Sequence, residues 1–253
     1  MKDSSTHHPA PFTFPELLRE GVILARPNRF IMDVLLEGET VRCHCPVVSR
    51  IGSLDLTGRP CLVSESSNKG RKTPFTVEAF SLDQPDAPRK QWIGINQTAS
   101  NRCVQHFLEQ GALSTLSGPV EQVSREVRLG SSRLDFLINE NLYLEVKTPL
   151  VQIQTDIPSS VPRLPEKPFN STERTMRHLR ELAASLADHD RAVILYCLYY
   201  ENSGFRYYHG TTYDEVMRTV QACHDAGVEL WQADFNVTPE HITLKRYHPL
   251  EEW

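Results

Sequence analysis

Asp135, Glu145 and Lys147 combine the residue types that a metal-dependent hydrolytic site needs. Carboxylate oxygens are ligands that Mg²⁺ prefers in proteins, and a bound divalent ion can activate a water molecule. A lysine ammonium beside them can stabilise the negative charge that develops during hydrolysis. A short polar segment at 139–141 separates the two acids, so its structure decides whether they meet.

Residues 132–147 are expected to form a β-hairpin that brings these side chains together. Apolar residues alternate with polar ones on both sides of the turn at 139–141, which is typical of strands with one buried face. The expected buried face carries Leu134, Phe136, Ile138, Leu142, Leu144 and Val146. The opposite face carries Arg133, Asp135, Tyr143, Glu145 and Lys147. With the turn centred on Glu140, Asp135 lies opposite Glu145, at a separation of roughly 5 Å.

Like charges opposed on a β-ladder destabilise it unless a cation compensates them. That cation can be a divalent metal ion or the ammonium of Lys147, two residues further along the same face. The alternative to a metal site is an exposed polar face with the ion pairs Asp135–Lys147 and Glu145–Arg133. Asp…Glu-x-Lys on adjacent strands is also the active-site pattern of the PD-(D/E)xK nuclease fold, which the hairpin resembles.

The elements around the hairpin follow the order of that fold. The sequence predicts a helix, a strand, the hairpin, a helix, a buried strand, a helix and two strands, at 101–113, 121–129, 132–147, 170–186, 191–199, 212–227, 228–235 and 242–247. Asn170 with Glu173, and Thr212 with Glu215, are typical of helix starts. We therefore expect a nuclease-like mixed sheet flanked by helices over residues 91–253.

The first part of the chain predicts a small β-barrel. Short strands alternate with turn signals at 21–26, 30–36, 40–45, 60–65 and 73–80. Five such strands suit an OB-fold-like domain over residues 12–90, so the whole chain is expected to be an α/β (α+β) protein. The segment 68–72 is a basic loop in this domain. Its alternatives are a solvated turn or a loop that contacts the phosphates of a nucleic acid.

Bulk composition is that of an ordinary globular protein. The chain has 253 residues, 40% of them apolar, and a net charge of −5, so a nucleic-acid site must be a local basic patch. Its six cysteines include no Cys-x-x-Cys pair and are expected to be reduced thiols near a core. No signal peptide and no long apolar run is present, so we expect a cytoplasmic protein without a membrane partner.

Several separated motifs together resemble the sugar fermentation stimulation protein A family. They lie at 43–46, 68–78, 125–137, 143–148, 172–182 and 191–194. The resemblance runs over nearly the whole chain and implies an OB-fold domain followed by a PD-(D/E)xK nuclease-like domain. It also implies DNA binding and a link to the regulation of sugar use. The chain departs from the family's pattern at 47–49 and at 167–171, which border the predicted site.

The resemblance gives the predicted site residues their expected roles. Asp135 and Glu145, with the carbonyl of Val146, would bind Mg²⁺ or Mn²⁺, and Glu126 would be a further ligand. Lys147 would orient the attacking water or stabilise developing charge. The residues expected to contact nucleic acid are Arg42, Lys69, Arg71, Lys72, Arg133, Arg174 and His178. Arg133 can instead pair with Asp135, and His178 can instead be a structural hydrogen-bond partner.

Three functions remain open from the sequence. The chain can be a metal-dependent nuclease, a non-catalytic DNA-binding regulator on a nuclease fold, or an interaction protein that uses neither site. DNA is the expected partner and RNA the alternative. The sequence leaves the oligomeric state open, with a homodimer among the alternatives.

Overall fold

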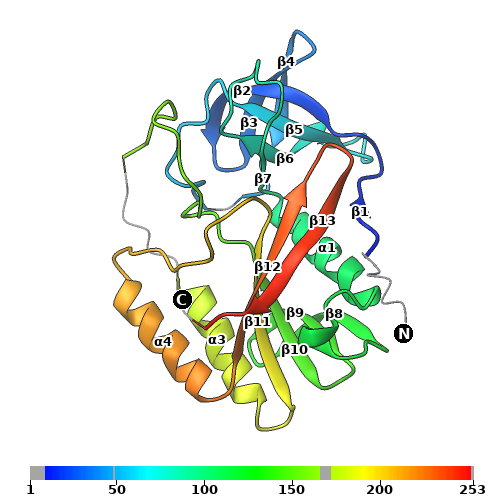
Figure 1. Cartoon of the computed structure of the whole chain (residues 1–253), viewed down its shortest axis with the longest axis vertical. Coiled ribbons are helices and arrows are strands. Elements are labelled where there is room, and N and C mark those ends of the chain that lie inside the picture. The colour runs from blue at the N-terminus through cyan, green and yellow to red at the C-terminus, as the bar shows by residue number, and fades with distance from the viewer. Residues whose placement is uncertain (1–8, 48, 166–171, 252–253) are drawn as a thin grey trace, which may run out of the picture.

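The computed structural model describes residues 9–47, 49–165 and 172–251, which form two β-sheet domains (Figure 1). The first sheet has the order β4-β3-β2-β5-β6-β7, and a parallel pairing of β4 with β6 closes its first five strands into a barrel. The barrel strands are β2 (Arg19–Asn28), β3 (Ile31–Leu36), β4 (Glu39–His44), β5 (Pro60–Glu65) and β6 (Phe75–Ser81). The predicted OB-fold-like barrel is therefore confirmed.

The second sheet has the order β1-β13-β12-β11-β10-β9-β8. Its strands are β1 (Phe12–Thr13), β8 (Val123–Leu129), β9 (Ser132–Ile138), β10 (Leu142–Lys147), β11 (Arg191–Leu198), β12 (Glu229–Val237) and β13 (His241–Pro249). β11 is the central strand and pairs in parallel with both β10 and β12. Its nearly continuous apolar sequence predicted this position, because a central strand is buried on both faces.

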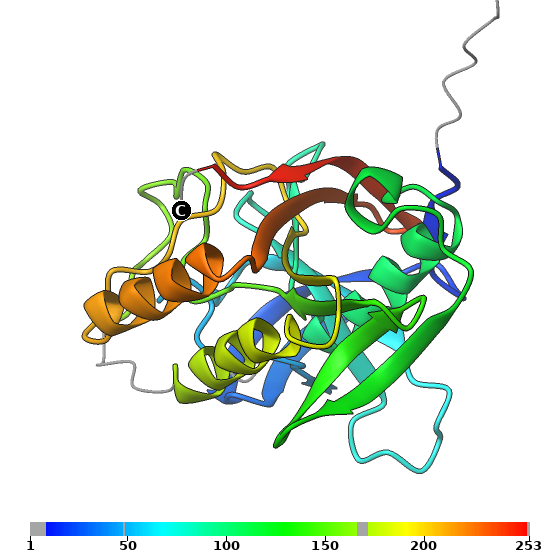
Figure 2. The same cartoon turned by 90° about the horizontal axis from the view of Figure 1, so that it is seen from below.

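Helices cover both faces of the second sheet (Figure 2). They are α1 (Gln97–Glu109), α2 (Ser114–Ser117), α3 (Glu173–Ser185) and α4 (Tyr213–Asp225). Along β11, Val193 and Leu195 pack in one cluster with Phe107 of α1. Ala192 and Ile194 point the other way and belong to the cluster that contains the apolar residues of α3 and α4. The predicted nuclease-like order of helices and strands is confirmed.

The short strand β7 (Trp92–Gly94) joins the two domains. It pairs with β6, and the Gly94 N–H donates to the Tyr199 carbonyl, just after β11, at 2.9 Å. The predicted domain bounds put residues 92–94 in the second domain and residues 12–13 in the first, whereas β7 pairs with β6 of the first sheet and β1 pairs with β13 of the second. Strands of two or three residues are too short to show a period, so the sequence could not place them.

The helix starts differ from the sequence prediction in their capping. Thr212 is the N-cap of α4, but its side chain makes no capping hydrogen bond and accepts one from the Thr172 hydroxyl at 3.4 Å. The predicted cap Asn170 and the segment 167–171 lie outside the described residues.

The sequence predicted reduced cysteines and no membrane-spanning segment, and the structure describes both the thiols and the helices. All six cysteines are buried free thiols, as predicted. Among the helices of the described residues, none is long and apolar enough to cross a lipid bilayer.

Candidate metal centre

The hairpin of β9 and β10 has the predicted register and splays apart at the two acids. Leu144 pairs with Phe136, which places Asp135 opposite Glu145. The backbone ladder ends there because carboxylates take up its next donors. The Val146 N–H donates to Asp135 Oδ2 at 2.8 Å, and the Asp135 N–H donates to Glu145 Oε2 at 3.3 Å. Backbone hydrogen bonds therefore hold the two acidic side chains between the strand ends.

Glu145 lies beneath helix α3, which gives it a second polar partner. Its side chain is almost completely buried, and its Oε1 accepts hydrogen bonds from Lys147 Nζ and His178 Nδ1, each at 2.5 Å. A carboxylate only accepts, so Nδ1 of His178 carries the hydrogen. Burial raises the pKa of Glu145, but the hydrogen bond from His178 and the charge of Lys147 outweigh it and lower the pKa overall.

Asp135 is the member of the pair whose pKa is raised. Its Oδ1 accepts a hydrogen bond from Asn101 of α1 at 2.6 Å. Burial and the nearby charge of Glu145 nevertheless raise its pKa from 3.8 to about 6, against the opposing hydrogen bonds and the charge of Lys147. Two adjacent carboxylates with oppositely shifted pKa values are typical of a functional site.

The structure contradicts the alternative of an exposed polar face with two simple ion pairs. Glu145 pairs with Lys147 and His178, and Arg133 pairs with Glu126 at 3.5 Å. The sequence could not show that α3 covers this face, because α3 follows a long loop whose path the sequence does not specify.

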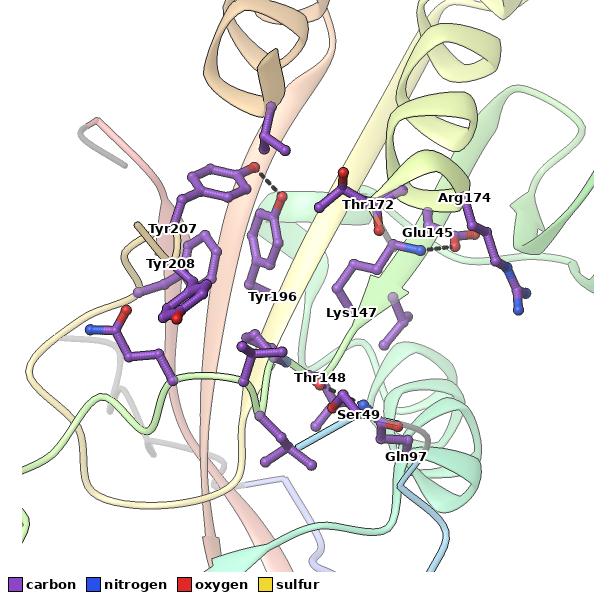
Figure 3. A pocket seen from close by; sticks show the side chains of 18 of the residues that line it. Ser49, Gln97, Glu145, Lys147, Thr148, Thr172, Arg174, Tyr196, Tyr207 and Tyr208 are labelled. Carbon is purple, nitrogen blue, oxygen red and sulfur yellow. Dashed lines mark hydrogen bonds and ion pairs between the residues drawn. The ribbon is translucent and has the colours of Figure 1, made fainter. Parts of the chain in front are cut away.

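The side chains of Asp135 and Glu145 line a cavity of about 420 Å³ beside the last residues of β10 (Figure 3). Asp135, Glu145, Val146, Lys147 and Arg174 all line it, so five predicted site residues meet there. Ser49 extends from the barrel domain to the same cavity. His178 lies behind Glu145 as its hydrogen-bond partner. The site therefore lies between the barrel and the second sheet.

Glu126 lies beside Asp135 on the neighbouring strand β8, but its carboxylate pairs with Arg133 and not with the site. Its neighbours Arg125 and Val127 pair with Phe136 and Leu134, so Glu126 lies opposite Asp135 in the ladder. Its φ of 54° is in the left-handed region, and its carboxylate pairs with Arg133 in solvent. In the described part of the chain, no three His, Cys, Asp or Glu side chains are grouped as metal ligands. The structure does not bring Glu126 to the cavity.

The predicted basic residues of the barrel lie apart from the cavity. Arg42 pairs with Asp33 at 3.2 Å across β3 and β4. Arg71 donates to the hydroxyl oxygens of Thr76 at 3.2 Å and Thr73 at 3.3 Å, so its guanidinium braces the loop between β5 and β6. Lys69 and Lys72 are exposed on that loop.

Polar residues that the sequence did not predict also lie at or near the site. Asn101 donates to Asp135, and Arg177 of α3 donates from Nε to the Ser132 hydroxyl at 3.3 Å. α1 begins one turn earlier than predicted, which places Asn101 inside the helix rather than at its start. Nothing in the sequence distinguishes Arg177 from the other basic residues of this helix.

A closed OB-type barrel joined to a helix-flanked mixed sheet, with Asp, Glu and Lys at the end of a splayed hairpin, defines a two-domain protein with a PD-(D/E)xK nuclease-like fold. Two family models match these domains: the SfsA N-terminal OB domain over residues 24–95, and the sugar fermentation stimulation protein RE domain over residues 98–241. The chain belongs to the sugar fermentation stimulation protein (SfsA) family.

Relatives of similar length support this assignment. The sugar fermentation stimulation protein homolog of Synechococcus elongatus is 35% identical and aligns over 95% of this chain and 98% of its own. The homolog of Pseudoalteromonas atlantica is 33% identical over 94% and 98% of the two chains. A solved structure, Pyrococcus furiosus SfsA in complex with Ca²⁺, has a TM-score of 0.70 at 20% identity and covers 93% of this chain and 96% of that one. That likeness shows a shared fold.

Proposed function

We propose that this protein binds nucleic acid and hydrolyses its phosphodiester bonds with a divalent metal ion. The observation that carries the proposal is the splayed hairpin end, where Asp135 and Glu145 lie side by side and Lys147 reaches Glu145. DNA is the proposed substrate. Through DNA binding, the protein would take part in the regulation of sugar metabolism to which the family's name refers.

The donor set at the hairpin end suits Mg²⁺ or Mn²⁺. Each oxygen of Asp135 accepts one hydrogen bond, and Glu145 Oε2 accepts one long bond, so each keeps a lone pair for a cation. Two carboxylates and a backbone carbonyl are few ligands, and Mg²⁺ characteristically keeps several waters. The Ca²⁺ complex of the Pyrococcus furiosus protein is consistent with a hard cation at a shared fold.

The side chains at the end of the hairpin have separate proposed roles. Asp135, Glu145 and the carbonyl of Val146 would hold the ion, which supplies charge neutralisation and an activated water. His178 positions Glu145 from α3 and is a positioning residue. Lys147 would then orient the water or stabilise the charge developing on the phosphate. Arg174, exposed at the rim, would contact a neighbouring phosphate.

Replacing Lys147 by Met tests this proposal. We expect the wild-type protein to cleave labelled DNA when Mg²⁺ or Mn²⁺ is titrated in, and not in EDTA. Lys147→Met should lower the cleavage rate about 100- to 1,000-fold, as removal of a charge-stabilising donor does in other hydrolytic enzymes. Rates are measured on single- and double-stranded DNA and RNA.

Lys90→Met is the matched control, because Lys90 is another partly buried lysine with an acidic partner, Glu20, outside the cavity. It should cleave at the wild-type rate. Cleavage that is unchanged in Lys147→Met would contradict the catalytic role. Tight DNA binding by the wild type without any cleavage would support the non-catalytic DNA-binding regulator instead.

The basic loop between β5 and β6 is the proposed second contact with nucleic acid. Reversing the charges of the exposed residues Lys69 and Lys72 to Glu should weaken DNA binding and reduce the slope of log affinity against log salt by roughly one for each lost phosphate contact. Arg71 is left in place because it braces the loop through hydroxyl groups. Arg89→Glu, on the next loop of the barrel, is the control, and an unchanged salt slope in the double variant would remove this loop from the interface.

A further inference from the structure

We propose that the aromatic half of the cavity binds one unstacked nucleobase beside the scissile phosphate, so that the site acts on single-stranded nucleic acid. The inference rests on the proposed phosphodiester hydrolysis and adds the class of substrate to it. Three observations carry it: the position of the aromatic residues next to Lys147, the rigidity of the wall that they form, and the distribution of charge along the cavity.

The aromatic wall begins on the strand next to Lys147. In the parallel pairing of β10 with β11, Lys147 is the register partner of Tyr196, so the two side chains leave the same face of the sheet. Figure 3 shows Tyr196, Tyr207 and Tyr208 on one side of Lys147, with Glu145 and Arg174 on the other. A single cavity contains both groups. A nucleotide with its phosphate at the acidic end would therefore direct its base towards the tyrosines.

The wall is braced before any ligand arrives. The rings of Tyr196 and Phe205 are stacked, with centroids 4.0 Å apart and planes at 12°. Tyr207 packs edge-on against both rings, and its hydroxyl forms a hydrogen bond with that of Tyr196. Tyr208 is partly exposed and lines the cavity beyond this group. A preformed aromatic surface favours a planar ligand, because little side-chain freedom is lost on binding.

Negative charge in the cavity lies at one end. Among the described lining residues, the carboxylates are Asp135 and Glu145. Glu145 accepts from Lys147, and the Asp135 N–H donates to Glu145, so both lie at the end of the cavity beside Lys147. The aromatic half has no carboxylate among these residues. Beside its tyrosines lie Arg206 and the amide of Gln154, whose Nε2 donates to the Arg206 carbonyl at 2.8 Å. Rings with hydroxyl and amide groups suit a neutral heterocycle, which can stack and form hydrogen bonds along its edge.

The size of the cavity selects for a base that is already unpaired. About 420 Å³ falls within the usual range for small-ligand pockets and cannot admit a base pair within a duplex. A base in a duplex must first leave its stack and its partner, which costs a few kcal/mol, whereas a single strand avoids most of that cost. The expected substrate is therefore a single strand or a frayed end.

The test compares the affinities of the protein for three labelled ligands: an oligothymidylate, an abasic strand of equal length and charge, and a duplex. Affinities are measured by fluorescence anisotropy with Ca²⁺ present, and gels check that the ligands are not cleaved. Wild type should bind the oligothymidylate at least about 10-fold more tightly than the abasic strand or the duplex. Tyr208→Leu should weaken oligothymidylate binding about 5- to 30-fold and leave abasic-strand binding unchanged. Tyr208→Phe keeps the ring and should bind as wild type does.

Tyr213→Leu is the matched control, because Tyr213 stacks on His209 at 3.8 Å and is not among the lining residues of the cavity. Equal affinity of wild type for the three ligands, or an unchanged affinity of Tyr208→Leu, would overturn the base pocket while leaving phosphodiester hydrolysis intact. If wild type binds none of the three ligands at low salt, the proposed function fails together with the inference.

Discussion

Asp135→Asn is expected to abolish metal-dependent cleavage, with a loss of at least about 1,000-fold, and to stabilise the metal-free protein at pH 8. The first effect follows because a neutral amide is a poor ligand for a hard divalent cation. The substitution preserves the shape of the side chain. The amide oxygen can still accept from the Val146 N–H, and its NH₂ can donate to Asn101 if the amide of Asn101 turns over.

The stability effect follows from the raised pKa of Asp135. The folded protein holds this proton up to about pH 6, whereas the unfolded chain releases it near 3.8. Ionisation therefore favours the unfolded state as the pH rises between these values, and the metal-free wild type loses stability over that window. After allowance for partial exposure, the loss is on the order of 2 kcal/mol, and Asp135→Asn should not show it.

Cleavage of labelled DNA measures the first effect, and urea unfolding at pH 4 and pH 8, with EDTA and then with Mn²⁺, measures the second. Wild type should gain stability from Mn²⁺ at pH 8, because a ligand that binds only the folded state stabilises it, and Asp135→Asn should not. Asp188→Asn, an exposed aspartate after α3, is the control and should follow wild type. Retained cleavage, or a metal-free Asp135→Asn protein less stable than wild type at pH 8, would contradict this account of the site.

Gly94→Val is expected to destabilise the protein by about 3 kcal/mol through the junction between the two domains. A Cβ at Gly94 would lie 2.6 Å from the Tyr199 Cβ and 3.1 Å from Val237 Cγ2. The Tyr199 Cβ is fixed to its own backbone, so no change of rotamer relieves the contact. The strands must separate instead, which also lengthens the hydrogen bond from the Gly94 N–H to the Tyr199 carbonyl.

Gly70→Ala is the control for this substitution. The closest atom to a Cβ at Gly70 is Oδ1 of the exposed Asn68, 3.3 Å away, and that side chain can move. Its effect should stay within about 0.5 kcal/mol. Thermal and urea unfolding of both variants give the comparison. A Gly94→Val protein as stable as wild type would show that the barrel and the sheet do not depend on close contact at β7.

The sequence was sufficient to predict the hairpin because two local signals agree. Strict alternation around a short polar turn fixes both the buried face and the register, and a slip of one residue would expose Phe136 and Leu144. A different signal placed β11 at the centre of its sheet, because its nearly continuous apolar run is typical of a strand buried on both faces. The barrel strands were also predicted, since each is a short apolar run bounded by turn residues.

What could not be predicted depends on contacts between distant segments or on single dihedral angles. The splay at Asp135 exists because side chains replace backbone acceptors in the ladder, which no periodicity reveals. The burial of Glu145 depends on α3, and the outward turn of Glu126 depends on one left-handed residue. The aromatic wall also escaped prediction, because Tyr196 lies on a strand whose apolar run indicates only a core.

The pairing of β1 with β13 has a consequence for the order in which the protein is assembled. The barrel closes through contacts between strands that are near one another in the chain, so it can form as soon as β6 has been synthesised. β1 must wait for β13, the last strand of the described chain, before it gains its partner. A contact between such distant segments forms slowly, because a long loop must close first. During synthesis, β1 therefore stays unpaired while the barrel, which follows it in the chain, can already be folded.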